Sequence, residues 1–131
     1  MVFLMPKLYQ KKMKEQLIKF ETAKLAKQKG FFEGYRLYNE YGNIWNTFFI
    51  GEEERKEYSA VSQSILQKWL RDEKEIIISV MYDLNSLKFH YRITHNSSGI
   101  KMSKFYGSKG FDSYEECLED SLIESLKLIE L

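Results

Sequence analysis

Residues 87–94 alternate between apolar and polar side chains, and this alternation constrains the fold more than any other feature of the sequence. Polar residues separate four apolar ones, Leu87, Phe89, Tyr91 and Ile93. Because successive side chains of a strand point to opposite faces, the pattern predicts a strand with one buried face. β-Branched residues at 76–82 and a third run at 100–106 predict strands on either side, joined by turns at 83–86 and 96–99. Lysines interrupt the third run, so we expect an edge strand there, followed by a loop at 107–110.

One helix is predicted before these strands in the sequence and another after them. Apolar residues recur at helical spacing after Ser59 or Ser62, either of which can cap a helix start. The last helix opens with Ser113 and, three residues later, Glu116, which has the form of a capping box. We expect the helices at 59–72 and 113–130 to pack together on one face of a three-stranded antiparallel sheet. The predicted core comprises Val61, Ile65, Leu66, Trp69, Ile76, Ile78, Val80, Phe89, Tyr91, Ile93, Leu118, Leu122, Leu126 and Ile129, and the last helix also buries Tyr114 and Cys117.

The N-terminal half is expected to extend this core. A lysine-rich helix is predicted over residues 7–29, with fraying turns at 7–14 and Gly30 at the position that favours a helix-ending glycine. Strands at 35–39 and 44–49 are predicted to form a hairpin around Tyr41, Gly42 and Asn43. At 131 residues the chain is expected to be one α+β domain, with residues 59–131 as its α-β-β-β-α core.

Aromatic residues concentrate in the segment 31–50, which holds eight of the 20 in the chain. Some of these rings are expected to complete the core. Rings that stay exposed are suited to anchoring a protein partner, because they supply large apolar area. The candidate partner-binding residues are Tyr35, Tyr38, Tyr41 and Trp45.

Charge is distributed unevenly, although the net charge is only +1. Residues 1–30 carry eight lysines and two glutamates, whereas residues 111–131 carry seven acids and one lysine. Two solvated helix faces that attract each other are one interpretation, with Glu115, Glu119 and Asp120 on the exposed face of the last helix. Nucleic-acid binding is another, through Lys11, Lys12, Lys14 and Lys19. The order helix, three strands, helix also occurs in double-stranded-RNA-binding domains. A helix that binds phosphate at its start should begin with basic residues, whereas the last helix here begins with acidic ones.

No catalytic or metal motif stands out. His90 and His95 are five residues apart and are expected on opposite sheet faces, and the only cysteine, Cys117, is expected in the core. The chain contains no Walker A loop, no Gly-x-Gly-x-x-Gly and no His-Glu-x-x-His. We therefore expect no enzyme, cofactor or metal, and no membrane span, since no apolar run approaches the length of one.

Four stretches resemble a family of small, uncharacterised phage and prophage proteins. They are the segments 20–31, 38–46, 59–71 and 113–129. The segment 59–71 contains the run Gln-Ser-x-Leu-Gln-Lys-Trp-Leu-Arg. The closing helix at 113–129 is also similar to that of HicB-type antitoxins. The chain departs from the family at Val61-Ser62, where Pro-Thr is frequent, and at Lys74, where histidine is frequent. The resemblance implies a phage or prophage origin and the host-cell cytoplasm, and it implies no activity.

These observations favour a non-enzymatic phage or prophage accessory protein that binds a host or phage protein. Modulation of a host process such as antiviral defence is one form that such binding takes. The alternatives are a nucleic-acid-binding protein that uses the lysine-rich helix, and a minor virion or assembly component. Homo-oligomerisation stays open.

Overall fold

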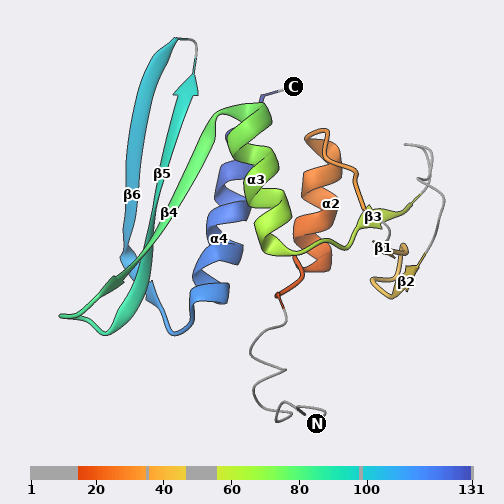
Figure 1. Cartoon of the computed structure of the whole chain (residues 1–131), viewed down its shortest axis with the longest axis horizontal. Helices are drawn as coiled ribbons and strands as arrows, with labels where there is room; N and C mark the ends of the chain where they lie inside the picture. The colour runs from red at the N-terminus through yellow and green to blue at the C-terminus, as the bar shows by residue number, and fades with distance from the viewer. Residues whose placement is uncertain (1–14, 35, 47–55, 98, 131) are drawn as a thin grey trace, which may run out of the picture.

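The computed structural model describes residues 15–34, 36–46, 56–97 and 99–130, which fold as one small α+β domain (Figure 1). Three helices and two three-stranded antiparallel sheets occur in the described residues. In chain order the elements are α2 (Phe20–Gln28), β1 (Arg36–Tyr38), β2 (Ile44–Asn46), β3 (Tyr58–Ser59), α3 (Gln63–Lys74), β4 (Ile76–Asp83), β5 (Lys88–Ser97), β6 (Ile100–Phe111) and α4 (Tyr114–Lys127). The predicted fold class is confirmed.

The main sheet has the order β4-β5-β6, with β5 in the middle. Ile78 lies opposite Ile93, and both are buried together with Tyr91 beneath the helices. The alternating pattern at 89–93 therefore marks the covered face, as predicted. Leu87 is an exception, because it lies in the β4–β5 turn with a φ of 56° and is exposed to solvent.

Strand β6 is longer than the sequence predicts. It continues through 107–110, which we expected to be a loop, and ends at Phe111 opposite Phe89. An irregularity in the pairing between Phe89 and Tyr91 accommodates the additional residues. A Cβ atom on Gly110 would lie 2.5 Å from the Cβ of Lys88, so the glycine permits a close approach of β5 here.

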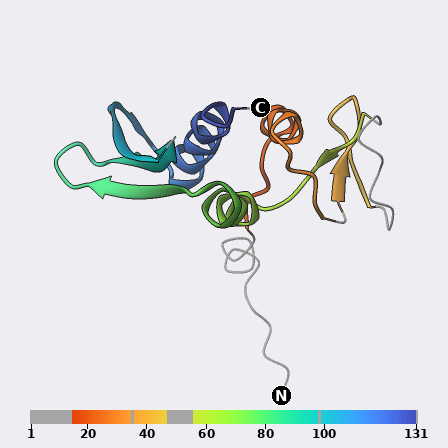
Figure 2. The same cartoon turned by 90° about the horizontal axis from the view of Figure 1, so that it is seen from above.

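Helices α3 and α4 pack against each other and against the main sheet. The Ser113 hydroxyl accepts a hydrogen bond from the Glu116 backbone N–H, so the predicted cap of α4 is present. Helix α4 contacts all three strands, whereas α3 contacts β4 and α4. Figure 2 shows both helices on the same side of the sheet.

The buried stripe of α3 differs in part from the prediction. Leu66 and Leu70 are fully buried, but Ile65 is exposed and Trp69 is only partly buried. Ile65 was wrongly placed in the core because helical spacing alone leaves the limits of the buried face undefined, and α4 and β4 cover the side that carries Leu66. Tyr114, at the start of α4, is also more exposed than predicted.

Helix α2 begins later than predicted, at Phe20. The residues before it are extended: Ile18 N–H donates to the Val61 carbonyl, and Gln63 N–H donates to the Gln16 carbonyl. This pairing with the chain ahead of α3 competes with helix formation at 15–19. The predicted helical turns at 7–14 lie outside the described residues.

The small sheet has the order β2-β1-β3 and includes the predicted aromatic hairpin. Asn39 closes the turn, since its side-chain oxygen accepts from the backbone N–H groups of Tyr41 and Asn43. Gly42 has a φ of 84°, the left-handed conformation that glycine adopts without strain. The two views agree that the helices lie between the main sheet and the small sheet (Figures 1 and 2).

Candidate functional site

Two of the four aromatic residues that the sequence suggested as partner anchors, Tyr38 and Tyr41, differ strongly in exposure. Tyr41 is 79% exposed at the hairpin turn. Tyr38 is only 7% exposed and its hydroxyl donates to the Ile18 carbonyl, so it belongs to the core and its candidacy as an exposed anchor was wrong. Its position in the middle strand of the small sheet, against α2, explains its burial. Tyr35 and the side chain of Trp45 lie outside the described part of the structure.

The candidate nucleic-acid site is also only partly described. Lys19 is exposed and precedes α2, where its backbone N–H donates to Glu119 at 3.0 Å. Lys11, Lys12 and Lys14 lie outside the described residues. The hypothesis of a lysine-rich contact surface therefore stays a prediction.

Glu119 is buried, although the sequence placed it on the exposed face of α4. It is 4% exposed and joins three parts of the chain. One carboxylate oxygen accepts from Thr22 in α2 and from the Lys19 backbone, and the other accepts from the Gln63 side chain at the start of α3 at 2.9 Å. A carboxylate beside two helix N-termini is stabilised by their dipoles. Burial, and secondarily the Glu119 charge, raise the pKa of Tyr38 nearby.

The β4–β5 hairpin tip exposes large apolar side chains at one end of the main sheet. Leu84 is 79% exposed and Leu87 is 65% exposed, and Tyr82 at the end of β4 and Tyr114 at the start of α4 are also exposed. We call these four residues, Tyr82, Leu84, Leu87 and Tyr114, the apolar tip. Exposed apolar side chains that gather in one region are a common feature of interaction sites.

Hydrogen bonds hold the turn that carries the apolar tip. The Asp83 carboxylate accepts from the Asn85 backbone N–H and from the Ser86 hydroxyl, both at 3.0 Å, and the Leu87 N–H donates to the Asp83 carbonyl. The first two bonds favour the ionised carboxylate and lower the pKa of Asp83. The turn therefore presents its leucines in a defined arrangement.

Aromatic packing supports the apolar tip from behind. The Phe89 ring lies 4.9 Å from Tyr82 and 6.2 Å from Tyr114, in edge-to-face geometry with both. This row connects β4, β5 and α4 under the turn. Sequence reasoning assigned Tyr114 to the core and 83–86 to a simple turn, so it missed this surface; the signal was the two leucines that flank Asn85 and Ser86.

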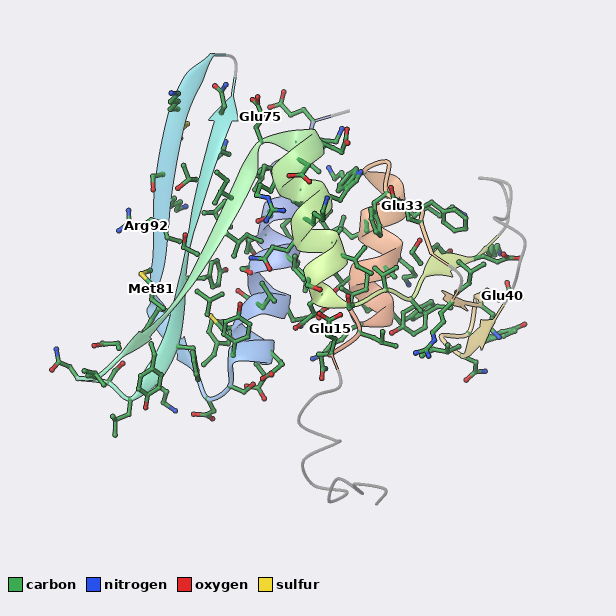
Figure 3. The ribbon with its side chains drawn as sticks, viewed as in Figure 1. Glu15, Glu33, Glu40, Glu75, Met81 and Arg92 are labelled. Atoms are coloured by element: carbon green, nitrogen blue, oxygen red, sulfur yellow. The ribbon has the colours of Figure 1, made fainter. Side chains whose placement is uncertain are left out.

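A groove of about 170 Å³ opens beside the apolar tip, between the starts of α3 and α4. Among the described residues its lining includes two carboxylates and no lysine or arginine: Glu15, Gln16, Gln63, Ser64, Gln67, Tyr114, Glu115 and Leu118. Figure 3 shows Glu15 below the first turn of α3, and the Ser64 hydroxyl donates to its carboxylate at 2.9 Å. We call this feature the α3–α4 groove.

A second, larger and more open groove of about 410 Å³ lies where α4 meets the end of β6. Its acids are Asp112, Glu116, Glu119 and Asp120, and Lys19 borders them. The Asp120 carboxylate accepts from the Tyr91 hydroxyl at 2.6 Å, and Asp112 pairs with Lys88. Several of these carboxylates are thus engaged in structural contacts.

The described residues contain no group of three or more histidine, cysteine or acidic side chains placed to hold a metal ion. Ser86 lies 3.1 Å from His90 Nε2, but its hydroxyl proton is donated to Asp83. His90 must then donate to Ser86, which is the reverse of what activation of a serine nucleophile requires. Burial raises the pKa of the Cys117 thiol to about 11, so this side chain is a poor nucleophile at neutral pH.

Within the described part of the chain, no helix has the length and apolar character needed to cross a membrane. Comparison of the sequence and structure with protein-family models, curated proteins and solved structures finds no match.

Proposed function

We propose that this chain is a non-enzymatic accessory protein of a phage or prophage that binds a host or phage protein. The observation that carries the proposal is the apolar tip. Four large side chains lie at the end of β4, in the hydrogen-bonded turn that follows it and at the start of α4, and burying them against a partner would remove their apolar area from water. Modulation of a host process such as antiviral defence is one outcome of such binding.

The apolar tip has two properties of an interaction surface. Its backbone is ordered by the Asp83 hydrogen bonds, which lowers the entropy lost on binding. Tyrosine and leucine also supply large apolar contact area.

A capture experiment with matched variants tests the proposal. Tagged wild-type protein and a Leu84→Ser/Leu87→Ser variant would be recovered from infected-cell lysate, with and without nuclease. We expect a stoichiometric protein to survive nuclease treatment with the wild type and to be lost with the variant. Met102→Ser, which changes an exposed apolar side chain on β6, is the control and should retain the partner.

Tyr41→Ser tests the original aromatic candidate in the same experiment. If this variant loses the partner and the leucine variant retains it, the interface lies on the small sheet. Retention of the partner by both variants would contradict both assignments.

Nucleic-acid binding through the N-terminal lysines is the second candidate. The eight lysines in residues 1–30 motivate it, and phosphate contacts would make the affinity fall steeply as salt rises. Recovery of RNA or DNA with the tagged protein, or loss of its partners on nuclease treatment, would favour this function. An absence of binding to RNA and DNA at low salt would rule it out.

A further inference from the structure

The two edges of the main sheet are protected differently. Strand β6 carries Lys101 and Lys104 and an irregular pairing near its end, which are features that discourage another strand from adding to an edge. Strand β4 reads Ile-Ile-Ile-Ser-Val-Met-Tyr-Asp and contains no lysine, proline or glycine. Among the described residues it pairs with no strand other than β5, so its other edge has no strand partner.

One hydrogen bond shows which backbone groups point to the open edge of β4. The Gln67 side chain donates to the Ile78 carbonyl at 3.4 Å, so this carbonyl points away from β5 and toward α3. Backbone groups of alternate residues point the same way in a strand. The N–H and C=O groups of Val80 and Tyr82 therefore also face outward, toward the end of the sheet that carries the apolar tip.

The α3–α4 groove lies next to this edge. Gln67 lines the groove and also reaches β4, and Tyr114 lines it and contacts Phe89, which in turn packs on Tyr82. A peptide strand beside Val80 and Tyr82 would direct alternate side chains toward the groove. The carboxylates of Glu15 and Glu115, with no basic side chain among the described residues of the lining, favour a positively charged side chain there.

We propose that an extended peptide segment of a partner adds to β4 as a fourth strand and places a lysine or arginine side chain in the α3–α4 groove. The inference rests on the proposed function, since it specifies how a protein partner binds. A second copy of this chain is a poorer occupant, because its own β4 carries no basic side chain to meet Glu15 and Glu115.

Selection from a random peptide library displayed on phage, with the whole protein as bait, supplies the probe. Enriched peptides should alternate β-branched or aromatic residues with other residues and carry a lysine or arginine at one shared position. A synthetic consensus peptide would then be titrated against the protein and followed by NMR. We expect the amide protons of Val80 and Tyr82 to exchange rapidly in the free protein and to become protected in the complex.

Charge substitutions test the groove separately from the strand edge. Glu15→Gln/Glu115→Gln should weaken binding of the consensus peptide about tenfold or more, the loss of a charge-assisted contact. The same variant should bind a peptide with norleucine in place of the basic residue as well as wild type does. Val80→Pro removes an outward N–H and should also abolish binding.

Three results would overturn the inference. They are a failure to enrich any peptide over an unrelated bait, binding that is unchanged by both sets of substitutions, and a dimer of the free protein that buries β4. Binding that maps only to Leu84 and Leu87 would overturn strand addition and leave the proposed function intact, which keeps the two failures distinguishable.

Discussion

Glu119 is a buried charged residue whose hydrogen bonds connect the three described helices. Its two carboxylate oxygens receive hydrogen bonds from the start of α2 and from the start of α3, while its own backbone belongs to α4. A buried charge is stable only when it is paired or hydrogen-bonded, and here three donors meet that need. The side chain therefore fixes the relative positions of the three helices.

Glu119→Ala should lower the free energy of unfolding by about 2–4 kcal/mol, because it leaves the Thr22 hydroxyl and the Lys19 N–H without their acceptor and removes one of the two acceptors of the Gln63 amide. Urea denaturation followed by circular dichroism measures this loss. Glu116→Ala, on the exposed side of the same helix, is the control and should change stability by only about 0.5 kcal/mol. Equal effects of the two substitutions would contradict the role of Glu119.

Cys117 should react slowly with thiol reagents in the folded protein. Burial, and secondarily the charge of Asp120, raise the pKa of its thiol to about 11. At neutral pH the thiolate fraction is then roughly a hundredfold lower than for a free cysteine, and access is blocked as well. Labelling with a chromogenic disulfide reagent, with urea-denatured protein as the control, measures the difference; equal rates would show that the thiol is accessible.

The same pKa shift has a consequence for stability at alkaline pH. A thiol whose pKa is raised on folding stays protonated in the native state when the unfolded state has already lost its proton. The stability that the protonated thiol contributes is therefore fully present below the pKa of the unfolded state. It is lost as the pH rises toward the folded-state pKa of about 11. Cys117→Ala should reduce this part of the alkaline decline in the melting temperature.

Strand β6 shows how an element extends beyond its local sequence signal. Glycine, serine and lysine at 107–110 favour a loop, but pairing with β5 continues to Phe111. The tertiary position of β5 supplies backbone partners that the local sequence does not reveal. Gly110 is part of this arrangement, because its missing Cβ makes room for Lys88.

Gly110→Ala should destabilise the protein by about 1–3 kcal/mol, the cost of forcing a rigid atom into an occupied space. Thermal unfolding measures the effect, with Ser103→Ala at an exposed position of the same strand as the control. A melting temperature unchanged from wild type would show that β5 and β6 separate without cost at this point.

At the scale of the whole molecule, one apolar core joins nearly every element. It includes Ala23 and Ala26 of α2, Leu66 of α3, Ile93 of β5 and Leu122 of α4. The main sheet, the helices and the small sheet share this core instead of dividing into separate units. Domains of this size and continuity usually unfold in one step.

We therefore expect tryptophan fluorescence and far-ultraviolet circular dichroism to report the same unfolding midpoint. Helices dominate the circular dichroism signal, whereas Trp69, one of the two tryptophans, reports on the packing of α3 against Phe31. Leu122→Ala should move both transitions together, by about 2–5 kcal/mol in the free energy of unfolding. Two separate transitions would indicate that the N-terminal half and the α-β-β-β-α core unfold independently.

The elements that could be predicted are those whose signals are local. Alternation at Phe89, Tyr91 and Ile93, the Ser113 cap and the glycine-containing turn at Gly42 each act over a few residues, and all three are confirmed. Periodicity also placed most of the core correctly. It failed at Ile65 and Glu119, because a helical pattern shows which residues share a face but not which neighbours cover that face.

The candidate sites depended more heavily on tertiary structure. Tyr38 and Tyr41 look equivalent in the sequence, yet β1 carries one into the core and the turn exposes the other. The apolar tip, the α3–α4 groove and the open edge of β4 likewise require knowledge of which segments are neighbours. By itself the sequence determined the α+β class and the type and order of most helices and strands, since these follow from local backbone preferences and apolar periodicity, whereas tertiary pairing set the start of α2 and the end of β6. Only the tertiary structure decided which charges are buried and which apolar side chains remain in water, because burial depends on contacts between residues far apart in the chain.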